Sequence, residues 1–245
     1  MTIDLAPYDF VDFGCSSGGS IKFAMERLGG VNGVGVDLDP AKVAATREKG
    51  FTAELADLTL PMSFKGKARF SLIAHVLEHI PSPKIAGQIL RTAASISSEF
   101  VLVRQPWFDS DGPLAAMGVK LYWSDWSGHT NHMTTLEMYL ALKPLLVKKL
   151  IASFTIFGYR RISHTSSDRI VPLDGPINRH HYAAEIDGPK PEAGLPFDCF
   201  DELVALIGVS PSYDATRLPP YFRDAKPILA LPVPGAAAIA ETLAR

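Results

Sequence analysis

A turn rich in glycine and serine near the start of the chain has the residue types of a cofactor site. Residues 14–18 read GCSSG between an apolar run and a helix-like stretch, and a second apolar run, residues 33–37, ends in Asp37. Glycines allow backbone amides to approach a ligand closely at the start of a helix. An acid at the tip of the next strand is placed to hold ribose hydroxyls. These features predict that the first part of the chain binds a nucleoside-containing molecule.

The same turn matches two other motifs. GxSxG is the nucleophile turn of α/β-hydrolases, which would make Ser16 a nucleophile, but that turn normally follows several strands and here only thirteen residues precede Gly14. Gly14, Ser16 and Gly19 also follow the GxGxxG spacing of dinucleotide folds. A serine at the middle position adds a side chain where a pyrophosphate would press against the backbone. The serine and the early position therefore favour a cofactor without phosphates.

Residues 75–79 read HVLEH and match the HxxEH zinc motif. That motif requires its two histidines on one continuous helix. His75, however, ends an apolar strand-like run, and Pro81 and Pro83 follow His79. We therefore predict no bound metal, and we expect His79 and Glu78 to orient the loop after this strand.

The elements that must position these residues alternate between strands and helices, the pattern of βαβ units. The predicted strands cover residues 8–13, 33–37, 51–56, 69–75, 100–104 and 154–163, and the predicted helices residues 20–28, 41–49, 83–96 and 136–150. This order predicts a doubly wound, Rossmann-like α/β fold with a mostly parallel, seven-stranded sheet and helices on both faces.

The C-terminal part of the chain differs in composition. Residues 172–234 hold eleven of the nineteen prolines, yet they also contain several aromatic residues, in which disordered tails are poor. We predict a core over residues 1–165 and a Pro-rich elaboration over residues 166–245. The elaboration is expected to pack on the same domain, to cover the acceptor site and to return residues 227–232 as a last strand.

Composition limits the remaining classes. Over 245 residues the chain is 47% hydrophobic and 20% charged, with a formal net charge of −2, as in ordinary globular proteins and without a general attraction to nucleic acid. No apolar run approaches the roughly 20 residues that span a bilayer. The acidic N-terminus is unlike a signal peptide, and two cysteines cannot form a disulfide framework. We expect a cytoplasmic protein without nucleic-acid or membrane partners; the sequence does not determine its oligomeric state.

Several motifs in order resemble class I S-adenosylmethionine-dependent methyltransferases, in particular the broad group that acts on small molecules and saccharides. They are DFGCSSG (residues 12–18), VGVD (34–37), ADLTLP (56–61), HVLEHIP (75–81), GHTNHMT (128–134) and FGY (157–159). The first departs from the family's D-x-G-x-G-x-G by Ser16 in place of the middle glycine. The resemblance covers residues 8 to about 164.

The resemblance implies S-adenosylmethionine as cofactor and a small-molecule or saccharide acceptor, methylated on a hydroxyl. The implied cofactor contacts are Asp12, Gly14, Ser16, Gly18, Asp37, Leu38, Asp57, Leu58 and His75. An oxygen acceptor also needs a base, and histidine suits that task near neutral pH. The candidates are His75, His129 and His132, the last two near Tyr122, Trp123 and Trp126. A protein that binds the cofactor without transferring methyl groups is the alternative, supported by Ser16.

Overall fold

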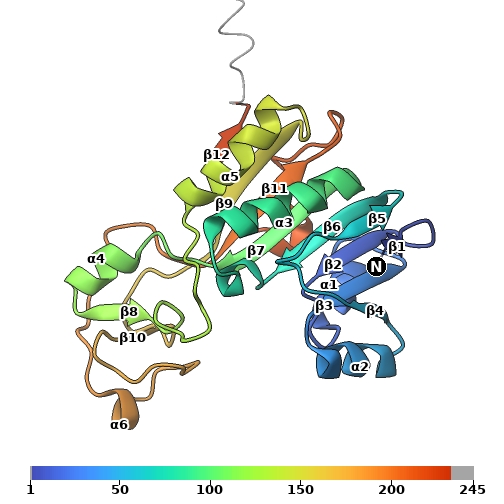
Figure 1. Ribbon diagram of the computed structural model, residues 1–245. Helices are drawn as coiled ribbons and strands as arrows, with labels where there is room; N and C mark the ends of the chain where they lie inside the picture. The colour runs from blue at the N-terminus through green and yellow to red at the C-terminus, as the bar shows by residue number, and fades with distance from the viewer. Residues whose placement is uncertain (1, 233–245) are drawn as a thin grey trace, which may run out of the picture.

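A mixed sheet of eight strands forms the centre of the molecule in the computed structural model, which describes residues 2–232 (Figure 1). In spatial order its strands are β12 (Lys226–Leu231), β9 (Ser153–Arg161), β11 (Phe200–Gly208), β7 (Ser97–Pro106), β6 (Ala68–Ala74), β2 (Phe10–Phe13), β3 (Gly33–Asp37) and β4 (Thr52–Leu55). Residues 233–245, the end of the predicted C-terminal elaboration, lie outside the described residues.

The strands from β4 to β7 are parallel, as the alternation of strands and helices predicts. Beyond β7 the sheet becomes antiparallel: β11 lies between β7 and β9, and β12 adds an edge strand to β9. The prediction of seven strands is therefore wrong by one. The C-terminal segment supplies two strands of the sheet: β12 confirms the last strand expected over residues 227–232, and β11, which was not predicted, pairs with both β7 and β9.

Helices cover both faces of the sheet, as predicted. One face carries α1 (Gly19–Arg27) and α2 (Pro40–Glu48), and the other carries α3 (Pro83–Ile96) and α5 (Thr135–Val147) (Figure 1). Successive residues of a strand point to opposite faces. Along β6, Phe70 and Leu72 accordingly join the buried cluster with α1 and α2, whereas Ile73 joins the cluster with α3. The sheet is thus buried on both sides, as its apolar strands require.

The C-terminal segment also takes the place of a helix on part of the first face. Phe222, in the short 3₁₀ turn η2 (Pro220–Phe222), is buried, and the half-buried Tyr213 stacks on Phe100 of β7 with ring centroids 4.7 Å apart. Both side chains belong to the cluster that contains α1 and α2. The segment therefore completes the core as well as the sheet.

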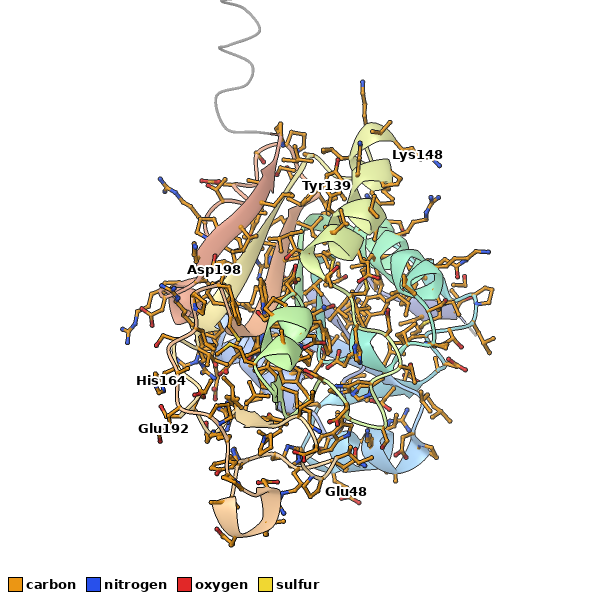
Figure 2. The ribbon with its side chains drawn as sticks, turned by 90° about the vertical axis from the view of Figure 1, so that its left-hand side faces the viewer. Glu48, Tyr139, Lys148, His164, Glu192 and Asp198 are labelled. Carbon is orange, nitrogen blue, oxygen red and sulfur yellow. The ribbon has the colours of Figure 1, made fainter. Side chains whose placement is uncertain are left out.

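A small lobe, formed by residues 107–133 and 162–199, lies beyond one end of the sheet (Figure 1). It holds α4 (Asp111–Ala116), β8 (Val119–Leu121), β10 (Ile170–Pro172) and α6 (Ala184–Asp187), and β8 pairs with β10. The labelled His164 and Glu192 lie on its outer edge (Figure 2), where His164 forms an isolated antiparallel β-bridge with Gly194. These short elements were not predicted. A further pair, β1 (Thr2–Asp4) and β5 (Ser63–Lys65), lies outside the main sheet.

Candidate cofactor and acceptor site

A cavity of about 720 Å³ opens at the carboxyl ends of β2, β3 and β6, where ligands bind in doubly wound folds. Its volume is within the range of small-molecule sites. The predicted cofactor residues among its lining are Gly14, Ser16, Asp37, Leu38, Asp57, Leu58 and His75. Predicted cofactor residues that lie far apart in the sequence therefore line one cavity.

The glycine- and serine-rich turn lies against this cavity. Gly14 has φ of +78°, and a Cβ atom at this position would lie 2.3 Å from a methyl group of Val76. Ser16 also has a positive φ, of +47°. Gly18, with φ of +86°, is the N-cap of α1 and does not line the cavity. Gly14 therefore lets the turn pack directly against Val76, while Gly18 allows the chain to turn into the helix.

Asp37 holds the turn in position. One of its carboxylate oxygens accepts a hydrogen bond from the Ser16 amide at 2.8 Å, and the other accepts from the Asp39 amide at 3.0 Å. Each oxygen can accept a further bond. Asp39, the next acid in the sequence, instead caps α2 by accepting a hydrogen bond from the amide of Ala41. Asp37 is therefore the acid that is available to a ligand's hydroxyl groups.

Asp57 and two leucines form another part of the lining. Oδ1 of Asp57 accepts from both the amide and the hydroxyl of Thr59, at 2.8 and 2.7 Å. These bonds orient the carboxylate. Leu38 is 66% exposed and Leu58 is half-buried, although both line the cavity. Apolar surface next to an oriented acid suits a flat heteroaromatic ring with an amino group.

Asp12 is not brought to the cavity. It is fully buried beneath the turn, where one oxygen accepts from the Ser20 hydroxyl and the other has no hydrogen-bond partner among the described residues. Burial raises the pKa of Asp12 to about 7; the Ser20 hydrogen bond opposes this shift, and the charge of Asp37 adds to it. Asp12 thus supports the turn from below instead of lining the site.

Cys15 is another buried group of the turn. It borders the larger cavity, and burial raises the pKa of its thiol to about 12. A thiol in this state is not a nucleophile near neutral pH.

A second cavity, of about 330 Å³, adjoins the first, because His75 and His79 line both. The small lobe provides an aromatic wall to it, with Tyr122, Trp123, Trp126, His129 and His180. The sheet end provides charged side chains, namely Arg160, Asp201 and Glu202, and Arg169 comes from the lobe. The small lobe therefore closes over the end of the sheet and encloses a polar, aromatic pocket.

His75 lies at the junction of the two cavities, directly after β6, with a positive φ of +55°. Its Nδ1 is 3.5 Å from an oxygen of Glu78, and its Nε2 is 3.8 Å from an oxygen of Glu202. Partial burial lowers the pKa of His75, but the hydrogen bond and charge of Glu78 and the charge of Glu202 outweigh it, so the net shift is upward. His75 therefore holds its proton more firmly than a free histidine.

His129 and His132 occupy different surroundings. His129 lines the second cavity, and its Nδ1 lies 2.8 Å from the carbonyl oxygen of Trp123; burial lowers its pKa despite this bond. His132 lines neither cavity, because its ring stacks on Phe108 with centroids 4.4 Å apart. Of the three predicted catalytic histidines, the structure brings His75 and His129 to one place, and not His132.

Several lining residues escaped the sequence analysis. Arg104 donates two hydrogen bonds of 2.8 Å to Glu202 across the β7–β11 pair. Burial raises the pKa of Glu202, but the bonds and charge of Arg104 outweigh it and lower it overall. No local pattern marks these residues. Their only signal is a charged side chain at the end of an apolar run.

The HVLEH stretch is divided between two elements, as predicted. His75 follows β6, while Glu78 and His79 lie in the 3₁₀ turn η1 (Leu77–His79). Instead of pairing with His75, His79 lies next to His129, with ring centroids 5.0 Å apart.

Comparison with protein-family models and with curated proteins found no match to this sequence. Solved structures do match. An S-adenosylmethionine-dependent methyltransferase from Archaeoglobus fulgidus aligns with a TM-score of 0.53 at 14% identity, over 82% of this chain and 88% of that one. Magnesium protoporphyrin IX methyltransferase from Synechocystis PCC 6803 has a TM-score of 0.47 at 14% identity, over 83% and 74%. A methyltransferase from Mesorhizobium loti has 0.47 at 16% identity, over 82% and 90%.

The likeness to the Archaeoglobus protein shows that this chain has the class I fold of S-adenosylmethionine-dependent methyltransferases. At this identity the comparison establishes the fold alone. Within residues 2–232, no helix is long and apolar enough to cross a bilayer.

Proposed function

We propose that this protein binds S-adenosylmethionine in the larger cavity and transfers its methyl group to a hydroxyl of a small molecule or saccharide in the smaller one. The observation that carries the proposal is the meeting of the two cavities at His75 and His79. Methyl transfer is an in-line displacement that requires donor and acceptor in contact, so positioning supplies much of its rate. Two adjoining cavities with a shared wall provide that arrangement.

The residues present suit this cofactor. Residues 14–17 of the turn line the larger cavity, so its backbone lies next to whatever binds there. Both oxygens of Asp37 can accept from ribose hydroxyls, and Asp57 with Leu38 and Leu58 suits an adenine ring and its amino group. The bound cofactor would supply a methyl group activated by a sulfonium. The chain itself orients the ligand.

The acceptor cavity favours an uncharged ring with several hydroxyl groups. The half-buried faces of Tyr122 and Trp126 suit stacking on a sugar or a flat ring. Arg169, Asp201 and Glu202 offer both donors and acceptors of hydrogen bonds around it. The hydroxyl that is methylated must lose its proton, and of the three predicted candidates for the base, His75 and His129 line this cavity.

Cofactor binding is tested by calorimetric titration of the full chain with S-adenosylmethionine and with its demethylated product. We expect binding by the wild type and at least tenfold weaker binding by Asp37→Ala, the loss of about 1.4 kcal/mol or more. Because Asp37 also holds the turn, Asp57→Ala serves as a second variant, with the same direction of change expected. The exposed loop acid Asp214, replaced by alanine, is the matched control. No binding by the wild type would refute the assignment.

Transfer itself is tested with methyl-labelled cofactor and a panel of saccharides and small hydroxyl compounds. Label in the acceptor supports the enzyme. Binding without turnover on any member of the panel would favour a protein that keeps the cofactor site and has lost transfer. Labelling of Ser16 by a serine-directed phosphonate would instead indicate a hydrolase, although among the described residues no histidine is hydrogen-bonded to its hydroxyl.

We also propose a cytoplasmic, reducing setting, which the two cysteines support. Cys15 and Cys199 are both buried free thiols, and burial raises the pKa of Cys199 to about 11.

A further inference from the structure

Three side chains that can bind a metal ion converge on the wall of the acceptor cavity. Glu78, His79 and His129 each offer one ligand atom, and these atoms all lie within 4.8 Å of one another. All three residues line the smaller cavity. Glu78 is 1% exposed, and its Oε2 has no hydrogen-bond partner among the described residues. A buried carboxylate oxygen without a partner costs free energy unless a ligand satisfies it.

Both histidines are oriented as metal ligands usually are. Nδ1 of His79 lies 2.8 Å from the carbonyl oxygen of Gly128, and Nδ1 of His129 lies 2.8 Å from that of Trp123. A carbonyl only accepts, so each Nδ1 carries the proton and each Nε2 keeps its lone pair. A second hydrogen bond of this kind fixes the ring and the tautomer of metal-bound histidines.

The backbone around the cluster is also fixed. Asn131 donates its amide to the Glu78 carbonyl at 3.1 Å and its side chain to the Leu77 carbonyl at 3.0 Å. The Thr130 hydroxyl donates to the carbonyl of Ile80 at 3.3 Å. These bonds join the segment that carries His129 to η1, which carries Glu78 and His79. The three ligands are therefore held together by a dedicated set of contacts and do not meet by chance on a flexible surface.

We propose that Glu78, His79 and His129 bind one divalent transition-metal cation on the wall of the acceptor cavity. Two imidazoles and one carboxylate suit zinc, cobalt, manganese or iron(II), and three protein ligands leave positions open. In a tetrahedral site the ligand atoms are about 3.4 Å apart, and the three atoms here lie within 4.8 Å of one another. All three residues line the smaller cavity, so a cation held by them would lie at its wall.

The role of the cation follows from its position and rests on the proposed function. A cation there would hold an oxygen of the acceptor beside the shared wall at His79 and lower the pKa of a bound hydroxyl. The sequence analysis predicted no metal because it considered only His75 and His79, the two histidines of the HxxEH motif, as joint ligands. In the structure, the ring of His79 lies next to that of His129, which belongs to another segment of the chain.

The site is tested without any activity assay. Full-length protein without an affinity tag is treated with chelator, dialysed and titrated with Zn²⁺ by calorimetry and with Co²⁺ by visible absorption. We expect one site per chain, and at least tenfold weaker binding in Glu78→Gln, His79→Gln and His129→Gln. His164→Gln, a histidine on the outer edge of the small lobe, is the matched control and should bind as the wild type does (Figure 2). Equal binding by the wild type and all four variants would overturn the site, as would no binding by the wild type.

The failure of the site can be told apart from the failure of the proposed function. Glu78 is buried and its replacement can unfold the chain, so the exposed His79 provides the decisive variant, with thermal unfolding measured alongside. Titration with S-adenosylhomocysteine reports on the cofactor cavity separately. Loss of Zn²⁺ binding in His79→Gln with cofactor binding retained supports the metal site. Retained Zn²⁺ binding in this folded variant refutes it, whatever the cofactor titration shows.

Discussion

At the scale of single residues, the glycine- and serine-rich turn depends on close contacts that leave no room for an added methyl group. A Cβ at Gly14 would lie 2.3 Å from Val76, and φ of +78° strains any other residue. We therefore expect Gly14→Ala to lower the free energy of unfolding by about 2–4 kcal/mol and to weaken cofactor binding. Denaturant unfolding and calorimetry measure the two effects.

Val76→Ala provides the control for this clash. In a double-mutant cycle, the pair should be less destabilised than the sum of the single variants by about 1–2 kcal/mol, because the smaller side chain removes the overlap but not the strain in φ. Strict additivity would show that the overlap is not what makes glycine necessary.

The buried Asp12 predicts a dependence of stability on pH. Its pKa is about 7 in the folded protein, against 3.8 for an unperturbed aspartate, so between about pH 4 and 7 the folded state holds a proton that the unfolded state has released. The contribution of Asp12 to stability should thus fall with rising pH, by at most about 1.4 kcal/mol per unit, and level off above pH 7. Asp12→Asn lacks this titration.

Urea unfolding of both proteins from pH 5 to pH 8 measures the difference directly. The stability of the wild type relative to Asp12→Asn should decline across this range. A relative stability that is constant or rises with pH would contradict the burial of an uncompensated carboxyl.

At the scale of elements, the insertion of β11 between β7 and β9 requires a small residue at one point of contact. A Cβ at Gly158 of β9 would lie 2.3 Å from the ring of Phe200 in β11. Gly158→Ala should lower the free energy of unfolding by about 1–3 kcal/mol, because two hydrogen-bonded strands cannot separate to make room.

Denaturant unfolding tests this, with Gly194→Ala as the control. A Cβ at Gly194 would meet only the Ser163 carbonyl oxygen, at 4.0 Å, and its φ is not in the left-handed range. Similar losses for the two variants would show that the contact with Phe200 does not limit the pairing.

At the scale of the whole molecule, the C-terminal segment is part of the sheet. A chain that ends at residue 165, the predicted limit of the core, would leave β7 and β9 without the strand between them and remove Tyr213 and Phe222 from the buried cluster. We expect such a chain to lose the cooperative thermal transition of the full protein. Circular dichroism against temperature measures it, and a sharp transition in the shortened chain would mean that residues 1–165 fold alone.

Local sequence signals predicted the parallel half of the fold, and most of the residues expected to contact a cofactor line the larger cavity. Each local feature depends on residues close to it in the sequence. Examples are the turn at residues 14–18, the strand that ends in Asp37 and the helix cap at Asp39. They are therefore readable without knowledge of the rest. The strand count was not, since β11 was not predicted as a strand and its place in the sheet depends on the edges of β7 and β9.

The sequence by itself determined the order of the parallel strands and their helices, and the turn at residues 14–18 with Asp37 at the end of the next strand, because backbone preferences and hydrophobic periodicity act over a few residues. Only the tertiary structure decided which polar groups share a cavity. It buried Asp12 beneath the turn, stacked His132 on Phe108 and brought His129 to Glu78 and His79. Contacts between distant segments depend on how these segments pack against one another, and packing depends on the whole chain.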